Sequence, residues 1–418
     1  MHKIIIVGAG FAGLQVAKGL VNSSFDVTII DKHNYHLFQP LLYQVATAGL
    51  SPAEIALPIR NIFRSQQNLK VILDELIGIR PKFNQITTRN NTYSYDFLIL
   101  ATGSELNYFD HDRWKKFSHG LKNIEEATFL RGKILKAFEK AERIKNTQAI
   151  KKLMKFVIIG GGPTGVEMAG AIAELSKKVL TKEFTTIDTK TAKIILLEAG
   201  SSILSTASHS LSIYARDSLE KLGVEVKCNT VVQSISESLV KTNNEVIDAE
   251  TIIWCAGIKA SPLGNLINIK TDEIGRVLVN DDLSIPKHPN IFAIGDTSHV
   301  KDQIGKPLPC LAPVAKQEGE FVAKVIKKSI LKDKTQNKFY YKNRGYLATI
   351  GRAKAIVDFG WFTLKGRIGW IFWSIIHIYF LIGFRNRLMV FTNWVWSYLS
   401  YSKGARLITN NKIEKNSS

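Results

Sequence analysis

Short runs of apolar, mostly β-branched residues recur along this chain, and two of them lead into stretches whose apolar positions repeat with a helical period. These two runs cover residues 4–7 and 156–159, and a glycine-rich turn separates each run from its helix. A second apolar run follows each helix, at residues 27–30 and 194–197. The order strand, turn, helix and strand predicts an α/β fold with two units of the same design.

Both turns have the form G-x-G-x-x-G. Their glycines are Gly8, Gly10 and Gly13 in the first turn and Gly160, Gly162 and Gly165 in the second. In such a turn the first glycine permits the tight bend, the second lets a pyrophosphate approach the backbone, and the third lets helix and strand pack closely. The pyrophosphate then lies against the partial positive charge of a helix N-terminus. Two such turns, each between a strand and a helix, predict two dinucleotide sites.

An acidic residue follows the second strand of each unit, Asp31 in the first and Glu198 in the second. A carboxylate at this position accepts hydrogen bonds from ribose hydroxyls, whereas a 2′-phosphate calls for an arginine. Residues 199–201 contain no arginine, so the second site is predicted to prefer NADH to NADPH. Glu198 lies 33 residues after Gly165, where roughly 20 is typical, and the excess fits an inserted stretch around residues 181–193. The alternative for either acid is a solvated residue at a strand end.

The two halves also end alike, because a further apolar strand closes each of them, at residues 97–100 and 252–255. The closing sequences contain Ala101, Thr102 and Gly103 in the first half and Gly257 in the second. A third apolar segment, residues 290–294, runs into Gly295 and Asp296. In open parallel sheets an acid at the carboxyl end of a strand faces the ligand crevice. Asp296 is therefore a candidate to bind a ribityl chain, with a structural turn aspartate as the alternative.

Composition narrows the class of protein. A chain of 418 residues that is 45% hydrophobic is long enough for two or three globular domains. The net charge of +20 accompanies no nucleic-acid motif, and the basic residues are scattered, so no nucleic-acid partner is expected. The three cysteines, Cys228, Cys255 and Cys310, form no C-x-x-C pair, and we expect neither a metal site nor a disulfide framework. The glycine turn interrupts the first apolar run, which argues against a cleaved signal peptide and export.

The last 60 residues differ from the rest. Five of the seven tryptophans lie there: Trp361, Trp370, Trp373, Trp394 and Trp396. Residues 368–384 carry no formal charge, and a helix of that length spans about 25 Å, less than a hydrocarbon core of about 30 Å. A second aromatic segment covers residues 388–401, and from Trp361 onward there are eight Lys or Arg and one acid. This pattern predicts two amphipathic helices that lie in one leaflet through residues 361–401; the alternatives are one transmembrane helix or a buried dimer or core helix.

Several sequences together resemble a known family. Both glycine turns, with the closing sequences and Gly295-Asp296, are similar to the two-dinucleotide-binding-domain flavoprotein oxidoreductases. The sequence H-L-F-Q-P-L-L-Y-Q-V-A at residues 36–46, G-G-G-P-T-G-V-E at 160–167, W-C-A-G-I at 254–258 and the aromatic tail resemble the type II NADH dehydrogenases, which are single-chain NADH:quinone oxidoreductases. The resemblance covers nearly the whole chain. It implies two Rossmann-like dinucleotide-binding domains, one for FAD and one for NADH, and a C-terminal amphipathic helical membrane-anchoring region.

From these regions we expect an FAD-binding domain of residues 1–115 and 285–340, an NADH-binding domain of 150–270 and a membrane-associating region of 341–418. By resemblance the flavin contacts are Gly8, Gly10, Gly13, Asp31 and Asp296, with Ala101, Thr102 and Gly103 beside them. The nicotinamide dinucleotide is assigned to Gly160, Gly162, Gly165, Glu198 and Gly257. Hydride then passes from nicotinamide to flavin, and the flavin passes two electrons to a membrane quinone.

Two residues are catalytic candidates by the same resemblance. The family carries an Ala-Gln-x-Ala-x-Gln pattern at its quinone pocket, and here the first glutamine is replaced by Pro313 while Gln317 keeps the second. Gln317 is the expected quinone contact, or otherwise an exposed helix glutamine. Glu167 follows the second turn, and burial there would raise its pKa and suit it to supply protons for quinol formation. The alternative is a first-turn glutamate that favours the helix dipole.

Three other classes of flavoprotein are alternatives to an NADH:quinone oxidoreductase. Disulfide reductases need a redox cysteine pair near the first helix, and no cysteine precedes Cys228. Sulfide:quinone oxidoreductases rely on cysteines around the flavin, for which only Cys255 and Cys310 are available. A flavoprotein similar to the apoptosis-inducing factors would use the tail to dock a protein. We expect a peripheral, monotopic protein on the cytoplasmic side of the cell (inner) membrane, without proton pumping; the type of quinone and homodimerisation stay open.

Overall fold

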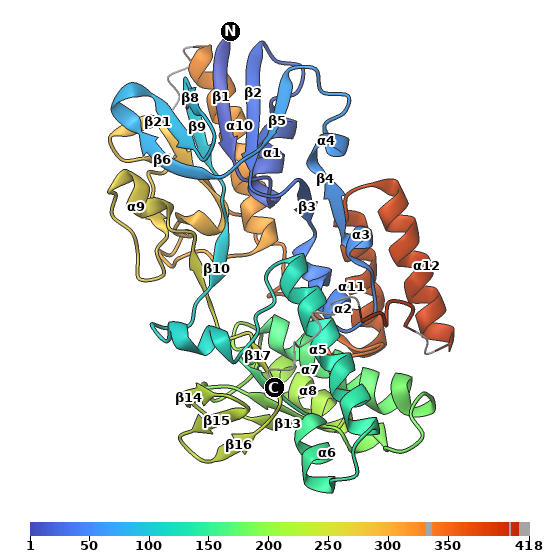
Figure 1. Cartoon of the computed structure of the whole chain (residues 1–418). Coiled ribbons are helices and arrows are strands. Elements are labelled where there is room, and N and C mark those ends of the chain that lie inside the picture. The colour runs from blue at the N-terminus through green and yellow to red at the C-terminus, as the bar shows by residue number, and fades with distance from the viewer. Residues whose placement is uncertain (332–336, 401–402, 409–418) are drawn as a thin grey trace. The chain divides into compact units, whose positions relative to one another are not determined.

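The computed structural model describes residues 1–331, 337–400 and 403–408 (Figure 1). The chain forms two compact units. The first unit contains residues 1–37, 56–105 and 258–344, and the second contains 38–55, 106–257 and 345–418. The structure thus groups residues 38–55 and the C-terminal region with the second glycine turn. From the sequence, residues 38–55 were assigned to the FAD-binding domain, and the C-terminal region was assigned to a separate membrane-associating region.

The first unit is organised around a six-stranded sheet in the order β20-β21-β9-β1-β2-β5. Its strands are β1 (His2–Val7), β2 (Phe25–Asp31), β5 (Leu69–Leu73), β9 (Phe97–Leu100), β20 (Ser284–Ile285) and β21 (His288–Ala293). All neighbours pair in parallel except β20, which is antiparallel to β21. Smaller elements surround this sheet: β3 (Tyr35–Leu37), β4 (Ala56–Pro58), α4 (Ile59–Ile62), β6 (Leu76–Arg80), β7 (Gln85–Thr88), β8 (Thr92–Ser94), β18 (Ile258–Ala260), α9 (Leu263–Ile267), β19 (Val277–Leu278) and β22 (Ser298–His299).

Two helices of the first unit, α1 (Phe11–Gly19) and α10 (Ala312–Ile330), pack directly on each other (Figure 1). Their approach is close because a Cβ at Gly319 of α10 would lie 2.4 Å from the carbonyl oxygen of Ala12 in α1. The chain leaves this unit through β10 (Ser104–Leu106). The pair of helices therefore fixes α1, whose N-terminus belongs to the first glycine turn.

The second unit repeats the plan with a four-stranded parallel sheet in the order β13-β12-β11-β17. These strands are β11 (Lys155–Ile159), β12 (Lys193–Leu197), β13 (Val224–Lys227) and β17 (Thr251–Trp254), and the helix α7 (Pro163–Glu174) follows the second glycine turn. Further helices of this unit are α2 (Leu42–Ala46), α3 (Pro52–Ile55), α5 (Ile124–Glu142), α6 (Thr147–Leu153) and α8 (His209–Lys221). Between α7 and β12 the chain adds a π-helical turn at Leu175–Val179 and 3₁₀ turns at Leu180–Lys182 and Thr189–Thr191. This insertion accounts for the long spacing between Gly165 and Glu198.

Antiparallel sheets that the sequence did not predict complete the second unit. One consists of β14 (Val232–Ser236), β15 (Leu239–Thr242) and β16 (Val246–Asp248). The other consists of β23 (Tyr346–Thr349), β24 (Ala355–Asp358) and β25 (Thr363–Lys365), and it carries the chain into the C-terminal helices. The α/β prediction with two Rossmann-like units and C-terminal helices is confirmed.

The C-terminal helices are α11 (Gly366–Phe380) and α12 (Phe384–Ser400), drawn in red in Figure 1. The sequence placed the end of the first helix at residue 384, and this boundary is wrong. Leu381 is extended and Gly383 has a φ of +89°, so a turn separates the helices and Phe384 begins the second one. Tyr401, the expected end of the second helix, lies outside the described residues. No helix among the described residues has both the length and the apolar character needed to cross a bilayer.

Candidate functional site

The first glycine turn is shaped by contacts that exclude any side chain at its outer positions. Gly8 has a φ of +102°, and a Cβ there would lie 2.3 Å from the carbonyl oxygen of Ala101. A Cβ at Gly13 would lie 1.9 Å from the carbonyl oxygen of Gly8. At Gly10, by contrast, a Cβ would meet no atom within 4 Å. Because Gly10 is the N-cap residue of α1 and no side chain caps this helix end, the open side of the turn suits a phosphate group.

Asp31 closes this turn from the end of β2. Its Oδ2 accepts a hydrogen bond from the backbone N–H of Ala9 at 2.6 Å, and its Oδ1 accepts one from the N–H of His33 at 2.7 Å. Burial raises the pKa of Asp31, and these two hydrogen bonds oppose that shift. Since each carboxylate oxygen accepts more than one hydrogen bond, the group both holds the turn and remains able to bind a ribose hydroxyl.

His36 is a candidate that the sequence interpretation missed. It is 2% exposed, and its Nδ1 lies 2.9 Å from the carbonyl oxygen of Ala9. Burial lowers the pKa of His36 to about 4, so the ring is neutral and Nδ1–H donates to Ala9. Nε2 is then an acceptor, buried and without a protein partner in the structure. The only available signal was the position of His36 at the start of the family-like sequence at residues 36–46.

A second segment joins the first turn at the carboxyl edge of the sheet. In the parallel register Ala293 of β21 lies beside Leu100 of β9, which brings the residues after both strands together. Hydrogen bonds then connect Ser104 with Asp296, Thr102 with Ser261, and the N–H of Gly103 with Thr297 Oγ1. Asp296, Ala101, Thr102 and Gly103 therefore lie in one group with Gly8.

Behind this group, the carboxyl group of Glu318 accepts hydrogen bonds from the Gly295 N–H and from Ser298. Burial raises the pKa of Glu318 to about 8. This buried contact joins α10 to the turn that presents Asp296.

The second glycine turn has the same construction. Gly160 has a φ of +106°, and a Cβ there would lie 2.7 Å from the Cα of Ala256. At Gly162 a Cβ would meet nothing within 4 Å, whereas at Gly165 it would lie 1.8 Å from the carbonyl oxygen of Gly160. Gly257, with a φ of +128°, lies at the end of the adjacent strand and contacts Phe109. Here too the open side of the turn is at the middle glycine.

Glu198 holds the second turn as Asp31 holds the first. Its Oε2 accepts a hydrogen bond from the Gly161 N–H at 2.6 Å, and its Oε1 accepts one from the Gly200 N–H at 2.7 Å. The parallel register of β11 and β12 sets this geometry, because it places Leu197 beside Ile159. Each unit thus has a glycine cradle closed by one carboxylate.

Glu167 lies on α7, directly after the second turn. The backbone N–H of Thr349 donates to its Oε1 at 3.5 Å, and burial raises the pKa of Glu167 to about 8. The thiol of Cys255 is also buried near Glu167, and its pKa is raised to about 12, mainly by desolvation. The raised pKa brings the titration of Glu167 close to neutral pH.

Gln317 makes an unexpected contact. It lies on α10, where Pro313 is in the first turn, a position that tolerates proline. The Gln317 amide donates to the carbonyl oxygen of Lys342 at 2.9 Å and accepts from the Lys342 N–H at 2.9 Å. Both ends of the side-chain amide are thus engaged by backbone.

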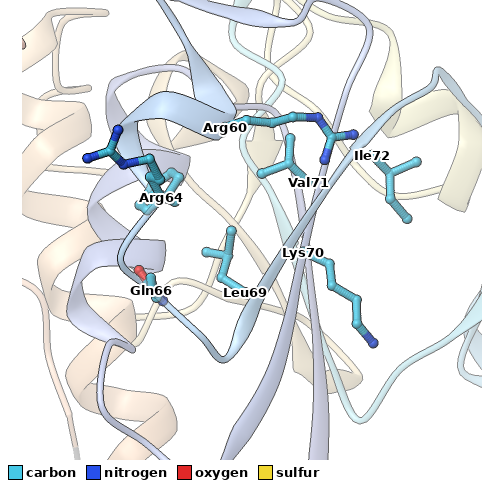
Figure 2. A pocket seen from close by; sticks show the side chains of 8 residues that line it. Arg60, Arg64, Gln66, Leu69, Lys70, Val71 and Ile72 are labelled. Carbon is cyan, nitrogen blue, oxygen red and sulfur yellow. The ribbon is translucent and has the colours of Figure 1, made fainter.

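A hollow of about 480 Å³ lies at the edge strand β5, lined by Arg60, Phe63, Arg64, Gln66, Leu69, Lys70, Val71 and Ile72. Figure 2 shows the charged ends of Arg60 and Arg64 pointing apart and that of Lys70 pointing away from both. None of the residues selected from the sequence lines it. Because its charged groups do not converge, we assign the candidate sites to the two glycine cradles instead.

Known proteins resemble this chain over nearly its whole length. Residues 2–319 match the family model of the pyridine nucleotide-disulphide oxidoreductases, and residues 343–400 match that of the NDH2 C-terminal domain. The chain is 36% identical to the type II NADH:quinone oxidoreductase NdhA of Mycobacterium tuberculosis, over 99% of this chain and 90% of that protein. The chain belongs to the type II NADH:quinone oxidoreductase family. A type II relative from Staphylococcus haemolyticus is 31% identical, over 84% of this chain and 87% of that protein.

Solved structures share the fold of this type II family member. The structure of NDH2 from Plasmodium falciparum in complex with NADH aligns with a TM-score of 0.90 at 21% identity, over 98% of this chain and all of that one. A sulfide:quinone oxidoreductase from Aquifex aeolicus aligns with a TM-score of 0.75 at 18% identity, over 95% of both chains. These likenesses concern the fold.

Proposed function

We propose that this chain transfers two electrons from NADH through FAD to a membrane quinone, without pumping protons. The observation that carries the proposal is the pair of glycine cradles, each closed by a carboxylate and each open at its middle glycine, in a member of the type II family. When bound, FAD accepts hydride from the nicotinamide and passes electrons on to the quinone.

The residues of the first cradle suit FAD. The open side at Gly10 has room for the pyrophosphate, and Asp31 has acceptor capacity for the ribose. The buried, unpartnered Nε2 of His36 and the carboxylate of Asp296 are acceptors for further hydroxyl groups of the cofactor. Gly8, Gly13 and the segment 101–103 shape the turn and its edge. We assign residues 1–115 and 285–340 to the FAD domain, although residues 38–55 and 106–115 of this range belong to the second compact unit.

We assign NADH to the second cradle, within residues 150–270. Gly160 and Gly165 shape the turn, Gly162 leaves room for the pyrophosphate, and Gly257 borders the end of the adjacent strand. The carboxylate of Glu198 binds ribose hydroxyls and repels a 2′-phosphate, which favours NADH over NADPH.

Quinone reduction consumes two protons, and Glu167 is the proposed donor of one of them. Its raised pKa keeps it protonated at neutral pH, as a general acid requires. Gln317 is the proposed quinone contact. Because the backbone of Lys342 engages its amide, that contact requires the two hydrogen bonds with Lys342 to open.

The C-terminal helices are the proposed lipid contact. Both are amphipathic: Trp373 and Val390 are buried, while Ile368, Phe384 and Leu399 are 67–80% exposed. Further exposed apolar residues are Trp361, Ile371, Ile375, Tyr379, Leu388, Phe391, Val395 and Trp396. With the basic residues around them, these helices fit one leaflet of the cytoplasmic side of the cell (inner) membrane. A homodimer that covers the same apolar face is the competing arrangement.

The test is steady-state oxidation of NADH by FAD-loaded, detergent-purified protein with a short-chain quinone, beside NADPH and beside oxygen alone. Fast turnover that depends on quinone and favours NADH is expected. If NADH reduces the flavin and quinone adds nothing, the proposal is wrong, and a flavoprotein that acts through protein partners becomes the better description.

A further inference from the structure

A series of side chains in the second unit connects the C-terminal helix α12 with Glu167. The indole Nε1–H of Trp394 donates to Oε1 of Gln44 at 2.8 Å, and Nε2 of Gln44 donates to the Tyr43 hydroxyl at 3.0 Å. That hydroxyl lies 3.1 Å from Oγ1 of Thr349, whose backbone N–H donates to Glu167. The series thus joins residues of four elements, α2, α7, β23 and α12.

The indole of Trp394 fixes the direction of the first two hydrogen bonds in the series. An indole N–H only donates, so the oxygen of the Gln44 amide faces Trp394 and its nitrogen faces Tyr43. The Tyr43 oxygen accepts that hydrogen bond, and between the Tyr43 hydroxyl and Oγ1 of Thr349 either group can be the donor. The two hydrogen-bond dipoles from Trp394 to Tyr43 therefore point their positive ends along the series toward Thr349, whose backbone N–H donates to Glu167.

The centre of the series is buried, whereas Gln44 and Trp394 at its outer end are half-buried. Tyr43 is 8% exposed and Thr349 is 2% exposed. Burial raises the pKa of the Tyr43 phenol above its ordinary value, with a further contribution from Glu167, so Tyr43 keeps its proton. In a low-dielectric interior, aligned hydrogen bonds strengthen one another and act strongly on a nearby charge.

Two titratable groups that interact with Glu167, the Tyr346 phenol and the Cys255 thiol, keep their protons at physiological pH. Burial raises the pKa of Tyr346 on β23 and that of Cys255 after β17, and both groups interact with Glu167. Glu174 lies about two turns further along α7. Burial raises the pKa of Glu174, while Lys403 and a hydrogen bond from the Arg352 N–H oppose that shift. The Tyr43 series is thus a directed polar connection to the Glu167 carboxyl from outside α7.

We propose that Tyr43 is a positioning residue for the proton of Glu167, and that Gln44 and Trp394 hold Tyr43 in the orientation this requires. The inference deepens the proposed function, because it rests on Glu167 as a proton donor in quinone reduction. The aligned dipoles stabilise the carboxylate that remains after Glu167 has released its proton. Without the Tyr43 hydroxyl the carboxylate is less favoured, and Glu167 titrates at a higher pH.

The test compares Tyr43→Phe and Trp394→Phe with the wild type in two half-reactions, reduction of the flavin by NADH and its reoxidation by a short-chain quinone, each followed from pH 5 to 10. In Tyr43→Phe the midpoint of the reoxidation profile is expected to rise by about half a pH unit or more, a shift typical of a changed neighbouring dipole. Trp394→Phe is expected to shift it less in the same direction, and the double variant is expected to be non-additive. Flavin reduction by NADH stays as in the wild type.

Matched controls remove the same groups elsewhere. Tyr95→Phe removes a buried phenol hydroxyl that has no partner in the structure, and Trp396→Phe removes an indole N–H on the exposed side of α12. Neither is expected to move the midpoint. If Tyr43→Phe lowers the melting temperature and leaves the midpoint unchanged, Tyr43 is merely structural and the inference is wrong.

An infrared titration separates this inference from the proposed function. The C=O stretch of protonated Glu167 is identified as the band that Glu167→Gln removes, and its pH midpoint is measured without quinone. A higher midpoint in Tyr43→Phe supports the inference even if the wild type fails to reduce quinone. An unchanged midpoint overturns it even if quinone turnover is fast.

Discussion

At the scale of single residues, Glu167 couples the stability of the protein to pH. Burial raises its pKa from the ordinary 4.5 to about 8. Between these values the native protein holds a proton that the unfolded chain has released, so the contribution of this group to stability falls as the pH rises from about 4.5 through 8. Glu167→Gln removes this dependence. Its melting temperature is expected to fall less than that of the wild type between pH 5 and pH 9.

Thermal unfolding of the FAD-loaded proteins at pH 5, 7 and 9 measures this difference. A gap of a few degrees is large enough to resolve, since about 1 kcal/mol moves the melting temperature by roughly 2–4 °C in domains of 150–250 residues. Glu220→Gln on α8, where the glutamate forms an exposed pair with Arg216, is the control and should run parallel to the wild type. A parallel curve for Glu167→Gln would show that Glu167 is ionised in the native protein at neutral pH.

Site residues could be predicted from the sequence where their role depends only on the residues next to them in the chain. Gly8 and Gly160 adopt positive φ angles in turns that the strand and helix beside them already indicate, and Asp31 and Glu198 lie at the ends of apolar runs. The sequence did not indicate that both carboxylates accept backbone N–H groups as well. The contact of Gln317 with Lys342 was beyond reach, because it depends on a partner 25 residues away in a segment without a periodic pattern. The functional assignments of all these residues remain predictions.

At the scale of elements, the packing of α10 on α1 supports the first cradle. Gly319→Ala introduces a Cβ that would lie 2.4 Å from the carbonyl oxygen of Ala12, so the two helices must separate. Such overpacking costs about 1–3 kcal/mol. We expect a lower melting temperature and a lower FAD content after gel filtration, while NADH binding to the second cradle persists.

The control for this substitution is Gly132→Ala in the interior of α5. A Cβ there would meet nothing within 4 Å, and the exchange of glycine for alanine in a helix contributes about 0.5–1 kcal/mol of stability. Retention of the full flavin content by Gly319→Ala would contradict a supporting role for this contact.

Elements with strong periodicity were predictable, and short ones were not. The central strands of both parallel sheets are continuous apolar runs, and the structure confirms them. The boundary between α11 and α12 was wrong because the apolar pattern continues through residues 381–383, while Gly383 takes a left-handed conformation that ends the periodicity. The antiparallel sheets, such as β14 to β16, consist of strands of three to five residues, too short for a pattern to stand out.

At the scale of the whole molecule, the net charge of +20 and the apolar face of α11 and α12 are expected to act together on a membrane. Binding to vesicles with 30% anionic lipid should weaken at 1 M salt, where charges are screened beyond about 3 Å, but should not vanish. The double variant Phe384→Ser, Trp396→Ser should lose the vesicle binding that persists at 1 M salt. Co-sedimentation with vesicles measures both effects.

Val246→Ser is the control for these changes, because it removes an exposed apolar side chain from β16. It should leave vesicle binding as in the wild type. If the double variant binds vesicles equally well and the wild type sediments as a dimer in solution, the apolar face belongs to a protein interface.

The open side of each cradle distinguishes two reasons for keeping a glycine in this motif, the fold of the backbone and the space for a ligand. Gly8, Gly13, Gly160 and Gly165 are demanded by the backbone around them, so any descendant that keeps the fold must keep them. At Gly10 and Gly162 a Cβ would meet no protein atom within 4 Å. In a chain that binds no nucleotide, an alanine at either position would therefore cause no steric clash. A descendant that had lost one of its two ligands would therefore still carry the outer glycines of that motif, and only the middle position would record the loss.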